Sequence, residues 1–150
     1  MQVKYLCFFS YRSLAEPLAL ALILEVSAYP KPGNVHRLRE RPGLRYEAFL
    51  ATGVFSLKYF ERGLKRGYRG VGRLVVGDLV YGLVKEVVER LRSTNTCLGS
   101  SLLLSLISVS LGRLRALGEG LGELSKISWD VLESTTPWDT VYYYKAIRVA

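Results

Sequence analysis

The residues best suited to chemistry lie in positions 21–37, in the run ALILEVSAYPKPGNVHR. Glu25 is the only charged residue of the apolar segment 18–29, and helical spacing aligns it with three leucines that we expect to face inward. These leucines are Leu14, Leu18 and Leu22. A carboxylate buried on that face would need a cation, a metal or hydrogen-bond donors. The polar residues that follow supply candidate partners: Lys31, Asn34, His36 and Arg37.

A proline-rich turn separates Glu25 from these polar residues. Pro30 and Pro32 bias the residues before them toward extended backbone, so a helix through Glu25 must end close to them. Gly33 then permits a positive φ or a close approach of the backbone to a ligand. The spacing of these residues alone favours an ordinary helix end followed by a tight turn.

Three blocks of the chain resemble the triphosphoribosyl-dephospho-CoA synthase family. EVSAYPKPGNVHR is similar to its signature block, E-x-x-x-x-PKPG-x-V-x-R. STNTCLGSSLLL, from Ser93, is similar to its threonine-asparagine-threonine block, and DTVYYYKAIRVA, from Asp139, resembles a run found in the archaeal branch. The blocks occur in the family's order across residues 25–150. In bacterial members a histidine and a lysine follow the asparagine-threonine pair, whereas Cys97 and Leu98 stand there in this chain.

The resemblance implies an enzyme that moves the triphosphoribosyl group of ATP to a hydroxyl of 3′-dephospho-CoA and releases adenine. Mg²⁺ is expected as the companion of ATP. Glu25 would be the catalytic carboxylate or a Mg²⁺ ligand, and the sequence leaves both roles open. The residues implied to bind ATP and its phosphates are Lys31, Gly33, Asn34, His36, Arg37, Thr94, Asn95 and Thr96.

Hydrophobic periodicity predicts an all-α protein, a bundle of about six helices that forms a single domain over residues 1–150. A capping box at Ser13 and Glu16 predicts a first long helix from about residue 14 to 28. Further helices are expected over 45–62, 79–92, 97–117 and 127–134 and from 137 onward, and no sustained alternation indicates a sheet. Family members are nearly twice as long, so we expect this chain to match the N-terminal half of a larger all-α domain. A homo-oligomer or a C-terminal half would then complete it.

The positive charge is confined to one segment. Residues 31–73 hold eleven Lys and Arg against three Glu, a net +8 that equals the net charge of the whole chain. A concentrated field of this kind suits a polyanionic ligand such as a triphosphate. Two alternatives remain: a non-catalytic nucleotide-binding protein, and a basic helical module for nucleic acid. The second is disfavoured because the aromatic residues of this segment fall mostly at core spacing.

The number of cysteines and the length of the apolar runs indicate where in the cell the protein is located. Cys7 and Cys97 are too few for a disulfide framework or a metal cluster, which favours a cytoplasmic protein. The N-terminal apolar run carries no secretion signal. The apolar run 98–111 is shorter than the roughly 18–20 residues needed to span a bilayer. We therefore expect no membrane association.

Overall fold

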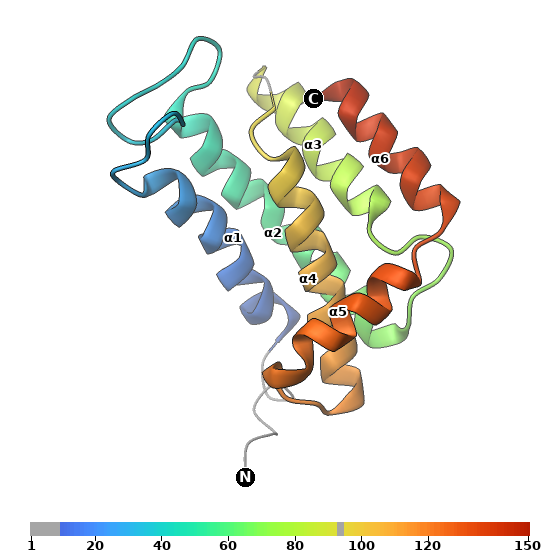
Figure 1. The fold of residues 1–150 in the computed structure, drawn as a ribbon. Helices are drawn as coiled ribbons and strands as arrows, with labels where there is room; N and C mark the ends of the chain where they lie inside the picture. Colours follow the sequence, from blue (N-terminus) through green and yellow to red (C-terminus); the bar gives the residue numbers. More distant parts are fainter. Residues whose placement is uncertain (1–9, 93–94) are drawn as a thin grey trace.

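The computed structural model describes residues 10–92 and 95–150. Within these ranges the chain forms six α-helices and one short 3-10 helix, with two isolated β-bridges and no β-strand (Figure 1). The elements are α1 (Tyr11–Ser27), α2 (Tyr46–Arg69), α3 (Gly77–Leu91), α4 (Leu98–Leu117), η2 (Leu121–Glu123), α5 (Leu124–Glu133) and α6 (Pro137–Val149). The prediction of an all-α bundle of about six helices is confirmed.

Helix α2 organises the bundle. It packs against α1, α4 and α3, and α3 carries α6 on its outer side (Figure 1). Helix α5 packs against α4. The core between the helices is built from aliphatic and aromatic side chains, of which the largest fully buried ones are Phe60, Leu64, Leu79, Leu83 and Leu114. The connection 28–45 and residues 95–97, which directly precede α4, lie at the same end of the bundle (Figure 1).

Three predicted helix boundaries were wrong, and one of them is the start of α5, which lies at Leu124 instead of at 127. Helix α1 begins at Tyr11, because the hydroxyl of Ser10 accepts the N–H of Ser13 at 3.0 Å and caps the helix. The Ser13 capping box is therefore not the start of the helix. Helix α2 continues past residue 62 to Arg69.

The extension of α2 depends on glycines in its contact with α4. Gly67 is buried inside α2, and a Cβ atom added there would clash with the carbonyl oxygen of Val109 in α4. Gly112 of α4 faces the backbone of Leu64 in the same way. Missing side chains thus let the two helix backbones approach closely. This contact outweighs the low helix propensity of glycine.

Asp139 joins α6 to α3. One of its oxygens accepts the N–H groups of Val75, Val76 and Gly77 at 2.8–2.9 Å, and the other accepts the N–H of Thr136 at 3.0 Å. Burial would raise the pKa of this carboxyl, but the four backbone donors hold the pKa below its usual range. Asp139 therefore caps two helices at once, as an anion.

Helix α4 lies in the interior of the bundle. It has 20 residues and is apolar enough, by length and composition, to cross a membrane, so the expectation that this run is too short was wrong. Its inner face is buried against α2, however, and carries the buried serines Ser101, Ser105 and Ser108. These features are those of a core helix, which passes the same composition test.

Candidate functional site

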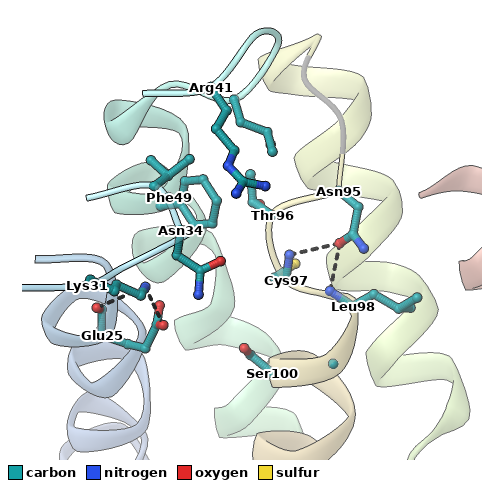
Figure 2. A pocket seen from close by; sticks show the side chains of 13 residues that line it. Glu25, Lys31, Asn34, Arg41, Phe49, Asn95, Thr96, Cys97, Leu98 and Ser100 are labelled. Carbon is teal, nitrogen blue, oxygen red and sulfur yellow. Dashed lines mark hydrogen bonds and ion pairs between the residues drawn. The ribbon is translucent and has the colours of Figure 1, made fainter. Parts of the chain in front are cut away.

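A cavity of about 300 Å³ lies where α1 ends and α4 begins (Figure 2). Its walls come from the turn after α1, the connection to α2, the first turns of α2 and the start of α4. The lining residues are Glu25, Lys31, Asn34, Val35, Arg41, Leu44, Phe49, Asn95, Thr96, Cys97, Leu98, Gly99 and Ser100. The fold thus brings together two sequence blocks that were singled out independently.

Glu25 is exposed, not buried as its predicted helix face required. Its side chain is 57% exposed and pairs with the ammonium group of Lys31, whose side chain is only 16% exposed. Adjacent helical residues point about 100° apart, and it is Val26, not Glu25, that continues the buried stripe of Ala15 and Ala19. The partner that the carboxylate needed is therefore a lysine at the rim of the cavity.

Lys31 also closes the end of α1. Its Nζ atom donates at 3.2 Å to the backbone carbonyl oxygen of Glu25, which also accepts the N–H of Ala28 at 3.4 Å at the C-terminus of the helix. Gly33 has the positive φ, +80°, that its position predicted. The side chain of Asn34 points into the cavity (Figure 2).

His36 and Arg37 do not line the cavity. His36 is buried, its Nδ1 atom accepts the N–H of Leu38 at 3.3 Å, and its ring packs edge-on against Tyr29 with centroids 5.5 Å apart. Arg37 is exposed. The structure thus places these two candidate phosphate ligands beside the cavity wall instead of within it.

The start of α4 forms the opposite wall. Asn95 Oδ1 accepts the N–H groups of Cys97 and Leu98 at 2.9 and 2.7 Å, which caps the helix. Thr96 shares a 2.7 Å hydrogen bond with Thr52 of α2, and this bond ties the segment to the bundle. Thr94, also a predicted site residue, lies outside the described residues.

Hydrogen-bond donors remain available on this wall. Within the described part of the chain, no acceptor faces the N–H groups of Gly99 and Ser100 or the hydroxyl of Ser100. Figure 2 shows the Ser100 hydroxyl directed toward the cavity. Together with the positive end of the α4 dipole, these groups form an environment that favours an anion.

Cys97 lines the cavity as a neutral thiol. Burial raises its pKa to about 11, despite a hydrogen bond with Thr96 that lowers it. The thiolate is the nucleophilic and basic form of cysteine, and this pKa leaves little of it at neutral pH. Cys97 therefore does not replace the basic side chain found after the asparagine-threonine pair in bacterial members.

The sequence interpretation missed Arg41, Phe49 and Ser100. Arg41 was not selected, because residues 37–41 alternate in charge, a pattern that is typical of a solvent-exposed stretch. Phe49 was assigned to the core by its spacing. Ser100 follows the Thr-Asn-Thr block by one helical turn, and that position was the available signal, since first-turn side chains often lie beside a bound anion.

The cations of the basic segment fall into two groups. Those on α2 are largely paired with carboxylates: Lys58 with Glu86 at 2.6 Å, Lys65 with Glu61 at 2.6 Å and Arg66 with Asp78 at 2.7 Å. Those of the connection 28–45 surround the cavity or face solvent. Pairing leaves α2 poorly suited as a continuous basic surface for nucleic acid.

No cluster of three or more His, Cys, Asp or Glu side chains able to hold a metal occurs in residues 10–92 and 95–150. Mg²⁺, however, commonly binds through one or two carboxylates together with substrate phosphates. Glu25 at the cavity rim fits that simpler mode of binding.

Comparison with known proteins identifies a family whose match includes the cavity. A family model described as ATP:dephospho-CoA triphosphoribosyl transferase (CitG) matches residues 11–150, from the first residue of α1 to the end of the chain. No curated protein and no solved structure matches the chain. The match spans both walls of the cavity.

Proposed function

Because the chain belongs to the ATP:dephospho-CoA triphosphoribosyl transferase family, we propose that it transfers the triphosphoribosyl group of ATP to a hydroxyl of 3′-dephospho-CoA and releases adenine. One observation carries the proposal. Residues from two segments far apart in sequence, 25–34 and 95–100, line a single cavity. The first provides a carboxylate and a lysine, and the second provides the N-terminus of a helix.

The reaction is a substitution at the anomeric carbon of the ribose. The bond from C1′ to the adenine nitrogen breaks and its electron pair leaves with adenine, while the acceptor oxygen bonds to C1′ and loses its proton. The transition state carries positive charge on the ribose, as in glycoside cleavage. Glu25 is exposed and lies at the C-terminal, negative end of α1, so it suits either stabilisation of that charge or acceptance of the proton.

The triphosphate requires donors, and the cavity offers them on both sides. Lys31 contributes a positive charge next to Glu25, and Asn34 contributes an amide. The N–H groups of Gly99 and Ser100 and the Ser100 hydroxyl suit phosphate oxygens at the N-terminus of α4. The Glu25–Lys31 ion pair must loosen when ATP binds, since both partners have roles toward the substrate.

Mg²⁺ would be held by Glu25 and by the amide oxygen of Asn34 together with the triphosphate. When bound, the ion neutralises part of the charge of the triphosphate. The carboxylate then serves as metal ligand, proton acceptor or both. We propose a cytoplasmic location, in keeping with the family's nucleotide substrates.

The decisive experiment measures adenine release from ATP and Mg²⁺, with and without 3′-dephospho-CoA, for the wild type and Glu25→Gln. We expect release that depends on the acceptor and falls by about a hundredfold or more in Glu25→Gln, because general-base catalysis contributes roughly 10²–10⁴-fold. Glu16→Gln is the matched control, since Glu16 lies on the same helix, pairs with Arg12 in solvent and does not line the cavity.

Other outcomes separate the alternatives. Retained ATP binding without any adenine release would contradict the transferase and favour a non-catalytic nucleotide-binding protein. Equal release by Glu25→Gln and the wild type would exclude the role given to the carboxylate. Steeply salt-dependent binding of DNA or RNA that ignores the Glu25 substitution would favour the nucleic-acid module.

A further inference from the structure

Arg41 is held in place by two consecutive tight turns. His36 and Arg39 exchange backbone hydrogen bonds of 3.0 and 2.9 Å, and Arg41 and Leu44 exchange bonds of 3.2 and 2.9 Å. Gly43, with φ +76°, adopts the left-handed conformation that the second turn requires. The backbone at Arg41 is thus fixed by its own hydrogen bonds, although it lies in a connection between helices.

The guanidinium group of Arg41 points into the cavity (Figure 2). One terminal nitrogen donates to the carbonyl oxygen of Gly33, which links the second turn back to the proline-rich turn. An arginine side chain carries five N–H donors in a planar fork. Among the described residues, the group has no carboxylate partner and no other acceptor. Most of its donors therefore remain available for a ligand.

The other cations of this region differ from Arg41 in one of two respects. Lys31 lines the cavity but is paired with Glu25. Arg37 and Arg39 do not line it. Within the described part of the chain, Arg41 is thus the cavity cation that no carboxylate neutralises. Figure 2 shows its guanidinium group between Asn34 and the start of α4, away from the Glu25–Lys31 ion pair.

We infer that Arg41 is a specificity-determining residue that binds the γ-phosphate and so selects a nucleoside triphosphate over shorter nucleotides. The inference rests on the proposed function for the identity of the ligand. If Glu25 acts at the ribose, the phosphate farthest from the ribose lies away from Glu25, and of the two cavity cations Lys31 and Arg41 it is Arg41 that makes no contact with Glu25. The fork of a guanidinium matches the oxygens of a terminal phosphate in a bidentate contact.

The test is calorimetric binding of ATP, ADP and AMP to the wild type, Arg41→Met and Arg41→Lys, with Mg²⁺ and salt held constant. We expect Arg41→Met to weaken ATP binding by roughly tenfold to a hundredfold and ADP binding by less than about threefold, given the usual strength of a charge-assisted contact. Arg41→Lys should recover part of the loss, because lysine keeps the charge without the fork. Arg39→Met is the matched control and should change neither affinity.

The loss of ATP affinity relative to ADP affinity distinguishes direct binding of the γ-phosphate by Arg41 from a purely structural role of Arg41 in its loop. If ATP and ADP binding weaken by the same factor, Arg41 only holds Gly33 in place and the inference is overturned. Unchanged binding overturns it too. If circular dichroism shows that Arg41→Met does not fold, the ratio of ATP to ADP affinity in Arg41→Lys decides: a lower ratio than in the wild type supports the inference and an equal ratio rejects it. Because binding needs no turnover, absence of adenine release would reject the proposed function while leaving this result intact.

Discussion

The ion pair at the cavity rim is asymmetric. Lys31 is mostly buried and makes two contacts with the same residue, the carboxylate and the carbonyl oxygen of Glu25. Glu25 has more than half of its side chain in solvent, so it can turn away without losing buried contacts. We therefore expect Lys31 to be the fixed member of the pair and Glu25 the mobile one.

Replacement of Lys31 by methionine should affect ligand binding much more than stability. The carboxylate of the pair is exposed to solvent, and such pairs contribute about 0–1 kcal/mol, so the free energy of unfolding should fall by less than about 1 kcal/mol in urea titrations. ATP binding, measured by calorimetry, should weaken by about tenfold, because a phosphate contact is lost. Lys85→Met is a suitable control, since Lys85 pairs with Glu89 on the surface of α3, away from the cavity. Equal ATP affinities for the wild type and Lys31→Met would refute the role of Lys31.

At the scale of elements, the connection between α3 and α6 depends on the charge of one carboxylate. Asp139 satisfies three N–H groups at the start of α3 as well as one at the start of its own helix. These donors would otherwise be buried without acceptors, which is costly. The third block that resembles the family therefore includes a residue whose role here is structural.

Asp139→Asn should destabilise the protein by roughly 1–3 kcal/mol at neutral pH, because the amide's NH₂ group faces a backbone donor. The carboxyl's pKa is lower in the folded state than in the unfolded state, so its stabilisation is complete above the ordinary Asp value of about 3.9. It is lost as the pH falls from there through the lowered folded value. The difference in unfolding free energy between wild type and variant should shrink over that range.

The matched control for this experiment is Asp130→Asn on α5. Asp130 is exposed and its carboxylate makes no hydrogen bond or ion pair within the described residues. Its substitution should leave both the stability and the pH profile unchanged. A difference between Asp139→Asn and the wild type that stays constant down to about pH 2 would contradict the pKa argument.

The sequence predicted the helices well and their ends less well. The predicted ranges of α3 and α4 and the predicted start of α6 agree with the structure to within about two residues, although only α3 buries a wholly apolar face, whereas α4 buries serines and α6 buries Asp139. The start of α1 was missed because Ser10 and Ser13 are both competent caps, and only the three-dimensional structure shows which one bonds. The end of α2 was missed because Gly67 stays helical through its close contact with α4. The sequence around Gly67 does not show that α4 packs there.

The candidate site was predicted in part. Lys31, Asn34, Asn95 and Thr96 line the cavity, as the two resembling blocks led us to expect. Arg41 was missed because its position depends on two hydrogen-bonded turns that charge patterning does not reveal. The burial of Glu25 was wrong because the segment packs through Ala15, Ala19 and Val26. The roles of these residues toward ATP, the oligomeric state and the location in the cell stay predictions.

At the scale of the whole molecule, the contact between α2 and α4 holds the bundle together. Gly63, Gly67 and Gly112 each leave room for an atom of the facing helix, respectively from Ser108, Val109 and Leu64. These contacts recur along the interface, and they join the two longest helices. The bundle therefore has a rigid central pair to which the other helices attach.

Gly67→Ala should lower the free energy of unfolding by about 1–3 kcal/mol, the usual cost of overpacking a tight interface, even though alanine favours helix formation. Gly72→Ala is the matched control, because a Cβ atom there would meet nothing within 4 Å. Thermal and urea unfolding of both variants would show the difference. An increase in stability for Gly67→Ala would mean that the two helices separate at little cost.

The close packing of α4 against α2 also limits how the cavity can vary among relatives of this chain. Thr96 is tied to Thr52, so the width of the cavity follows from the depth at which α4 sits against α2. Gly112 lies about 21 Å along α4 from its first residue, at a rise of about 1.5 Å per residue. Natural variation at this remote glycine would therefore change how tightly a nucleotide is held. A relative that has lost the glycine should have either a compensating change in α2 or a different choice of substrate.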